Sequence, residues 1–400
     1  MVSQRILDFA GTWGRRLWPV YLGLISVVWA ALVWRPAWIQ NGHISSDWLI
    51  DYRFGLVRRG LSGELLWPLQ HATGLAVEYW VAIVQLACFV VLVAGLWWLT
   101  RRVRPPLAFW LLALSPATLA FSFFSEVEAG RKEVLLFALY AVFAVWLVRL
   151  RQGAQQAASQ SAPFWMLPVW GLTVVAAVLM HELLAFYVPW MVALLWCTGA
   201  MPRAQRWALS VALLGSAAGA LALLAVWGGP LDGARFCRAF VSDGMSASIC
   251  RGILVFPITS VAESVTNTRL LASQFGYAQV YAPGLLLALL PVAWMAWEEG
   301  WRVTRRWLLW LLACLVATLP LFVLAVDWGR FIQIHLVLGL LTWAACLTLG
   351  AKAEAAPSRP VRRASVLAAA AVCLVLWDLP VCCETGVGSG VVGQVARIVR

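Results

Sequence analysis

Long apolar runs of about 17 to 22 residues recur along the whole chain and constrain its fold more than any other feature. A helix of this length crosses roughly 30 Å of hydrocarbon, and no run shows the alternating ten-residue pattern of a membrane barrel. With 62% hydrophobic and 12% charged residues, the chain cannot cover a water-soluble globule with an ordinary polar surface. We therefore expect an all-α polytopic membrane helix bundle that forms a single domain over residues 1–400.

Arginine clusters separate the apolar runs and indicate how the chain is threaded. Because short cytoplasmic loops are rich in arginine, the clusters predict a cytoplasmic amino terminus and about 11 transmembrane helices. The net charge of +12 comes from these clusters, which form no single basic face for nucleic acid. The first run lacks an Ala-x-Ala cleavage site, which predicts a retained helix rather than a signal peptide. Arginine far outnumbers lysine, as is typical of a GC-rich bacterial genome, so we expect a bacterial inner-membrane protein.

The expected membrane helices follow the apolar runs. They are residues 17–34, 79–100, 106–124, 134–148, two short helices within 163–199, 207–227, 283–297, 307–326, a helix ending at Gly350, and 364–379. This path places the first outer loop, residues 36–78, and the largest outer loop, residues 228–282, on the periplasmic or exterior side, with amphipathic segments on the membrane surface. For residues 163–199, a re-entrant hairpin is the alternative.

Two cysteines of the largest outer loop are candidates for a disulfide. Cys237 and Cys250 would face an oxidising compartment in the expected topology. The alternative is that both are small apolar residues that fill space. No cysteine and histidine spacing typical of a structural zinc site occurs.

The stretch from Asp47 to Glu64 is unusually charged for so apolar a chain. If it is helical, the spacing of four residues places the carboxylates of Asp47 and Asp51 on one face, where they could hold a divalent metal or deprotonate an acceptor hydroxyl. The neighbouring Arg58 and Arg59 precede a glycine and suit a phosphate. The alternative is an interfacial helix that dips its aromatic side chains into lipid.

Two further outer loops share the pattern acid, any residue, glycine, arginine. It occurs at Glu128 to Arg131 and at Asp327 to Arg330, each at the expected start of a helix. An arginine in the first turn opposes the helix dipole by roughly 0.3 to 1 kcal/mol unless an anion lies there. A phosphate or pyrophosphate would supply that anion, and the alternative is a local ion pair between the acid and the arginine.

His181 and Glu182 interrupt an apolar run, where an unpartnered polar side chain would be costly. They are candidates for a general base or for a hydrogen-bonded structural pair. Together with the loops above they complete the candidate site, whose members fall into three groups. The catalytic candidates are Asp47, Asp51, His181 and Glu182; the phosphate-binding candidates are Arg58, Arg59, Arg131, Lys132 and Arg330; the supporting residues are Arg53, Glu128 and Asp327.

The layout of acids in the first outer loop, outer-facing arginines and one large outer loop resembles the GT-C class of membrane glycosyltransferases and the Wzy-type polysaccharide polymerases. The resemblance covers the arrangement of the whole chain and rests on short motifs. It implies a polyprenyl-phosphate or pyrophosphate-linked sugar donor, with Asp47 or Asp51 as base and Arg58, Arg59, Arg131 and Arg330 on the lipid phosphate. The chain departs from the GT-C pattern because it lacks an Asp-x-Asp or Glu-x-Asp motif in that loop and a soluble carboxyl-terminal domain.

These observations predict an enzyme that transfers or polymerises sugars for the cell envelope at the outer face of the membrane. Its partners would be the polyprenyl-linked donor, a glycan or lipid acceptor and membrane lipids, with no nucleic acid. No cofactor is indicated beyond the open question of a divalent metal. The alternatives are a transporter or flippase for an anionic lipid or solute, and a membrane scaffold.

Overall fold

The computed structural model describes residues 2–35, 39, 42–103, 105–121, 130–156, 163–255, 261–298, 301–350, 372, 375–380, 382 and 390. These residues form helices joined by short connections and contain no strand, although Val57 and Gly229 form an isolated parallel bridge. Within the described residues, seven helices are long and apolar enough to cross a membrane. The predicted class, an all-α polytopic membrane protein, is confirmed.

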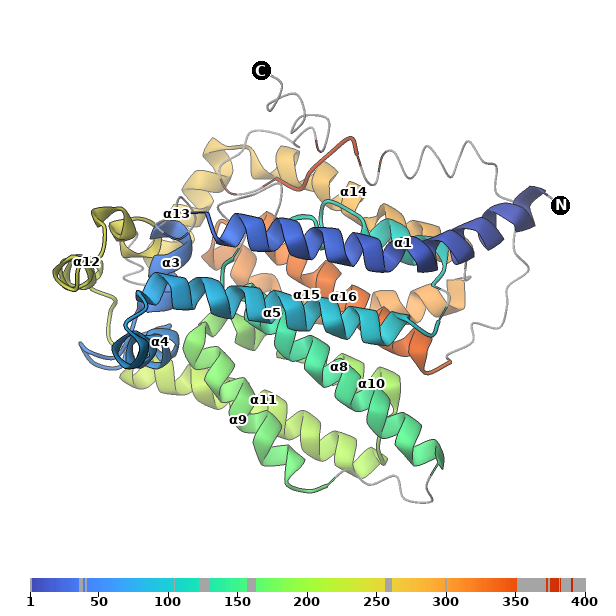
Figure 1. Cartoon of the computed structure of the whole chain (residues 1–400), viewed down its shortest axis with the longest axis horizontal. Coiled ribbons are helices and arrows are strands. Elements are labelled where there is room, and N and C mark those ends of the chain that lie inside the picture. Colours follow the sequence, from blue (N-terminus) through green and yellow to red (C-terminus); the bar gives the residue numbers. More distant parts are fainter. Residues whose placement is uncertain are drawn as a thin grey trace. The chain divides into compact units, whose positions relative to one another are not determined.

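The chain divides into two compact units, where the sequence suggested a single domain. The first unit contains Met1–Ile25, Ala94–Glu128 and Val265–Arg400, and the second contains Ser26–Val93 and Ala129–Ser264. Three helices, which Figure 1 labels, contribute residues to both units. They are α1 (Val2–Val33), α5 (Val77–Thr100) and α13 (Val261–Gln274).

The first unit is organised around one buried helix. It contains α6 (Leu107–Ala113), α14 (Tyr277–Glu298), α15 (Trp301–Leu324) and α16 (Trp328–Thr348). Every residue of α16 from Gly329 to Ala345 is buried, as expected for a helix that is apolar on all sides. Its Trp343 ring packs edge-on against Phe109 of α6, with centroids 5.6 Å apart.

The second unit holds most of the outer-loop sequence. Its helices are α3 (Gly42–Leu49), α4 (Gly60–Thr73), α8 (Glu133–Gln156), α9 (Met166–Met180), α10 (Val188–Thr198), α11 (Arg203–Trp227) and α12 (Gly233–Ser242), with the short 3-10 helices η1 (Glu182–Tyr187), η2 (Ala247–Cys250) and η3 (Gly252–Leu254). Helices α9 and α11 pack side by side (Figure 1).

The apolar segment 163–199 is broken as predicted. Helix α9 ends at Met180, His181 is extended, and η1 leads into α10. The His181 ring nitrogen Nδ1 accepts a hydrogen bond from the Leu183 amide at 3.4 Å, which caps the new helical turn. The prediction of two short helices with the His-Glu pair at their junction is confirmed.

The expected helix over residues 106–124 is shorter in the structure. Helix α6 ends at Ala113, and turns follow it through the described residues up to Ala120. Pro116 cannot donate a backbone hydrogen bond and disfavours helix in the preceding residue. The Thr118 hydroxyl donates to the carbonyls of Leu112 and Ala113 and so satisfies the end of the helix. Most of the expected last helix, 364–379, lies outside the described residues.

Candidate functional site

Arg59 is the centre of a buried group of charged side chains in the second unit. Its Nε donates to both carboxylate oxygens of Glu182 at 3.1 and 3.0 Å, and Nη2 donates to Glu182 Oε1 at 2.8 Å. Its Nη1 donates to Asp47 Oδ1 at 3.0 Å. Arg59 therefore joins the first outer loop to the junction between α9 and α10.

The backbone of Arg59 is strained. Its φ of 68° lies in the left-handed region, which a residue with a side chain adopts at a cost on the order of 1 to 3 kcal/mol. Glycines bring the surrounding segments close: a side-chain carbon at Gly63 would collide with the backbone carbonyls of Leu49 and Ile50. Such strain persists only where the surroundings fix it, and it concentrates at functional sites.

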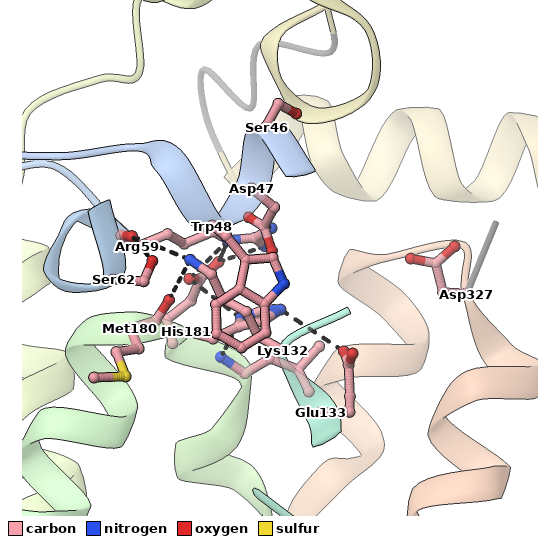
Figure 2. A network of polar contacts seen from close by, with 12 residues as sticks. Ser46, Asp47, Trp48, Arg59, Ser62, Lys132, Glu133, Met180, His181 and Asp327 are labelled. Carbon is pink, nitrogen blue, oxygen red and sulfur yellow. Dashed lines mark hydrogen bonds and ion pairs between the residues drawn. The ribbon is translucent and has the colours of Figure 1, made fainter. Parts of the chain in front are cut away.

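Lys132 lies next to the contact between Arg59 and Glu182, and its side chain has no solvent exposure. Its Nζ donates to the carbonyl of Met180 at 2.8 Å and to the carbonyl of Arg59 at 3.2 Å. It also lies 6.0 Å from the centroid of the Trp48 ring. Figure 2 shows the side chains of Asp47, Arg59, Lys132 and His181 gathered beside that ring. Lys132 thus fixes the backbone at both ends of the Arg59 to Glu182 contact.

His181 faces two carboxylates. Its Nδ1 lies 3.6 Å from Glu182 Oε2, and its Nε2 lies 3.8 Å from Glu133 Oε1. Because Nδ1 accepts from the Leu183 amide, the ring proton belongs on Nε2, which points it toward Glu133. We call the six residues of this network the ion cluster: Asp47, Arg59, Lys132, Glu133, His181 and Glu182.

Trp48 and Gln85 hold the loop that carries Lys132. The Trp48 indole and the Gln85 amide donate to the Gly130 carbonyl at 2.9 and 2.6 Å. Gly130 has a φ of 80°, which favours glycine. In the pattern that begins at Glu128, the glycine thus serves the turn before α8, and Glu128 itself lies outside the described residues.

The electrostatics of the ion cluster fix its charge state. Burial acts to raise the pKa of Asp47, but Lys132 and Arg59 outweigh it and hold that pKa well below its ordinary range. Burial lowers the pKa of Lys132 to about 8, although Asp47 opposes the shift. Burial and the Arg59 charge lower the pKa of His181. At neutral pH, Asp47 is therefore ionised and His181 is neutral.

Asp51 belongs to a different contact from Asp47. Helix α3 ends at Leu49, so the two acids do not share a helical face. The Asp51 carboxylate accepts from Arg53 Nε at 2.7 Å, and Arg53 Nη1 reaches Asp243 at 2.6 Å. Each of the two carboxylates is thus neutralised by its own arginine, which removes the basis for a shared metal. Among the residues that the structure describes, no three His, Cys, Asp or Glu side chains gather as metal ligands would.

A disulfide-bonded segment packs on the first outer loop. Cys237 of α12 is bonded to Cys250 of η2, which confirms the predicted disulfide. The Phe236 ring packs edge-on against Phe54, with centroids 5.0 Å apart, and η3 packs against α3. Much of the largest outer loop therefore folds over the loop that carries Asp47.

Arg330 forms a local pair in the first unit. Its Nη2 contacts Asp327 Oδ2 at 2.7 Å across three residues, at the start of α16. A side-chain carbon at Gly329 would collide with the Pro380 carbonyl. The local ion pair, the alternative to a phosphate site, is what the structure contains, and the glycine allows close packing of protein on protein.

The remaining phosphate candidates keep partly exposed side chains. Arg58 and Arg131 are intermediate in exposure, and each adjoins a member of the ion cluster in sequence. Arg131 and Arg251 add to burial in lowering the pKa of His43, so these three groups share one electropositive region. Lys132 and Arg59 are hydrogen-bonded within the ion cluster and its adjoining backbone.

Sequence reasoning missed three residues of this region. Trp48 entered the sequence analysis only as one of the aromatic side chains of the alternative interfacial helix, and Gln85 and Glu133 were not among the candidates. The one available signal was that a glutamine within an apolar membrane run requires a partner. No sequence spacing connects Gln85 to its partner Gly130, which is 45 residues away.

The fold and the site together define the class: this is a multi-pass, all-helical membrane protein with a buried ion cluster beside its spanning helices. The chain belongs to the family described as uncharacterised membrane protein Rv1490, which residues 20–267 match. The matched segment includes every member of the ion cluster and excludes Asp327 and Arg330. No curated protein and no solved structure matches the chain.

Proposed function

We propose that the protein is a membrane glycosyltransferase or polysaccharide polymerase that uses a polyprenyl-phosphate or pyrophosphate-linked sugar. The reaction would take place at the outer face of a bacterial inner membrane, with the ion cluster as its catalytic centre. The observation that carries the proposal is the Arg59 contact with Glu182 and Asp47, because a strained residue joins one buried and one partly exposed carboxylate in an apolar chain. Buried ionisable groups in membrane proteins are functional candidates by default.

Glu182 is the most accessible carboxylate of the ion cluster and is assigned as base, although burial, which acts to raise its pKa, is outweighed by Arg59, which holds that pKa well below its ordinary value. Its side chain is 18% exposed, whereas that of Asp47 is 7% exposed and that of His181 is 1% exposed. In the proposed step, Glu182 accepts the proton of an acceptor hydroxyl while that oxygen bonds to the anomeric carbon. The bond from that carbon to the donor phosphate breaks, and the phosphate leaves with the electron pair. Arg59 orients Glu182, and His181 at 3.6 Å offers it a neutral neighbour.

The donor phosphate is assigned to the arginines beside the ion cluster. The ion cluster contains three carboxylates and two cations, Arg59 and Lys132. The cluster therefore suits a neutral hydroxyl better than an anion. Arg131 and Arg251, which together lower the pKa of His43, supply the positive potential that a phosphate requires. Arg58 is the third partly exposed arginine of this set.

The test is turnover by purified protein supplied with a panel of polyprenyl-phosphate and pyrophosphate-linked sugars, measured as released polyprenyl phosphate. Glu182→Gln should reduce turnover by at least about a hundredfold while donor binding persists, as expected for the loss of a general base. Glu64→Gln, which changes an exposed carboxylate of the same unit, is the matched control and should retain activity. Full activity in Glu182→Gln would overturn the assignment.

A transporter or flippase for an anionic lipid or solute is the second candidate. The observation that favours it lies in α16, where Gln333 and His335 are buried within a candidate membrane span. The His335 ring contacts the Thr318 hydroxyl at 2.8 Å. Movement of a labelled lipid-linked sugar across vesicles containing the protein, without release of polyprenyl phosphate, would favour this function over transfer.

A further inference from the structure

An apolar cavity lies in the second unit between the ends of three helices. It has a volume of about 230 Å³ and is lined by Trp146 of α8, Leu167 of α9 and Ala208 of α11, with Phe164 and Met201 from the adjoining turns. Helices α9 and α11 run side by side here (Figure 1). Trp146 lies 13 residues after Glu133, so the cavity is about 20 Å along α8 from the ion cluster.

The lining of the cavity favours hydrocarbon over water. Apart from Gln205, its lining residues are apolar. An apolar cavity of about 150 Å³ remains dry and takes up molecules of the size of benzene, so a larger one has room for part of an alkyl chain. Phe164 lines the cavity yet is 82% exposed, which means that the cavity opens at the surface of the helices.

Positive charge gathers beside the cavity, at the start of α11. The first turn of this helix contains Arg203 and Arg206 and no acidic residue, and Pro202 supplies no side-chain cap. An arginine in the first turn opposes the helix dipole, and the free amides of that turn attract an anion. The Arg206 guanidinium lies 4.6 Å from the Trp196 ring centroid, and its buried Nε has no hydrogen-bond partner among the described residues.

We infer that this end of the second unit binds an anionic phospholipid of the membrane, with part of one acyl chain in the cavity and the phosphate at the start of α11. The apolar cavity suits the hydrocarbon chain, and Arg203, Arg206 and the free amides of the first turn of α11 suit the phosphate. An anionic phospholipid has both groups. A zwitterionic lipid offers the same chain with no net negative charge. Arg149 and Arg151 near the end of α8 add to the positive potential.

The experiment is native mass spectrometry of the full chain in mild detergent, with phosphatidylglycerol and phosphatidylcholine titrated separately. Phosphatidylglycerol should bind about tenfold more tightly. The double variant Arg203→Gln with Arg206→Gln should remove this preference and weaken phosphatidylglycerol binding more than phosphatidylcholine binding. Arg102→Gln, an exposed arginine at the end of α5, is the charge-matched control and should bind as the wild type does.

The cavity is tested separately by filling it. Ala208→Trp should weaken binding of both lipids about tenfold, whereas Val211→Trp, at a 68% exposed position of the same helix, should not. Thermal unfolding of each variant establishes that it is folded. Equal binding of the two lipids to the wild type would overturn the role of the arginines, and wild-type binding by Ala208→Trp would overturn the role of the cavity. Added inorganic phosphate should not compete, because it lacks the chain.

Discussion

Arg59 and Arg330 both have little exposed side chain and both contact carboxylates, but over very different sequence separations. Arg330 is 5% exposed and contacts an acid three residues away, at the start of its own helix. Arg59 contacts one acid 12 residues away and another 123 residues away, from a strained backbone position. The first pair supports one helix end, while the second joins separate segments of the second unit.

This difference shows which of the two arginines depends on the tertiary fold and which depends only on its own helix. A local pair across three residues is retained whenever its helix forms. The Arg59 contacts form only when α4, α3 and the α9 junction are all in place, so they report on the assembly of the unit. Function is accordingly assigned to the ion cluster, and the Asp327 pair is assigned to the start of α16.

The largest expected effect is on Arg59 itself. Arg59→Met should lower the free energy of unfolding by about 3 to 5 kcal/mol, because the buried Asp47 and the partly exposed Glu182 both lose their partner. Arg330→Met, the matched variant of the local pair, should cost less because one carboxylate is affected. Denaturant titration in detergent, followed by tryptophan fluorescence, measures both. Equal losses would remove the distinction between the two arginines.

The two regions should also differ in the effect of a methyl group on a glycine. Gly329→Ala should cost about 1 to 3 kcal/mol, since the added carbon meets the fixed Pro380 backbone carbonyl. Gly60→Ala meets the Tyr52 ring, a side chain that can move, and should cost less. The control is Gly215→Ala in α11, where nothing lies within 4 Å and alanine favours the helix. The same unfolding titration ranks the three variants, and a larger loss for Gly60→Ala would contradict the comparison.

Acid should destabilise the ion cluster in a defined pH window. The pKa of His181 is lowered from its ordinary value of 6.5, so below pH 6.5 the unfolded state binds a proton that the folded state resists. The free energy of unfolding should therefore fall as pH drops below 6.5. The contribution of Asp47, whose pKa is lowered from 3.8, should be lost only below pH 3.8.

Two histidine variants separate this effect from general acid sensitivity. His181→Asn should reduce the slope of stability between pH 6.5 and about pH 5, leaving the part that His43 contributes because its pKa is lowered as well. His71→Asn, at an exposed position, should keep the slope of the wild type. A slope in His181→Asn that is as steep as in the wild type would assign the effect to groups other than His181.

The smallest effect is expected at the exposed pair beside the cluster. Arg53 is 27% exposed and its partner Asp243 is 36% exposed, so water and salt screen their attraction. Asp243→Ala should cost less than about 1 kcal/mol, because Arg53 keeps its second partner Asp51, and the loss should shrink as salt is added. A loss as large as that of Arg59→Met would mean that α12 and η2 are held in place mainly through the contact between Arg53 and Asp243.

The sequence predicted the spanning helices because each is specified by its own composition. The break at His181 was also visible, since two polar residues interrupt an otherwise apolar run. The early end of α6 was missed, although Pro116 marks it. The prediction followed the length of the apolar run, 106–124, and gave too little importance to the proline within it.

The candidate site was predicted as a set of residues but not as a set of contacts. Asp47, Arg59, His181 and Glu182 were all selected from their charge in an apolar context. Their pairing depends on how α3, α4 and the α9 junction meet, which no spacing encodes. Lys132 was assigned to phosphate for its charge, whereas its burial against two carbonyls follows from the tertiary fold.

The separation of Arg59 from Glu182 also sets an order in time. At roughly 5 to 20 residues per second, Glu182 is synthesised about 6 to 25 s after Arg59, as 123 residues lie between them. Asp47 is made before Arg59 and is present throughout that interval. The guanidinium therefore has one carboxylate during membrane insertion and gains the second when α9 and α10 arrive. The segment from Asp47 to Arg59 becomes fully charge-compensated only once nearly half of the chain has been synthesised.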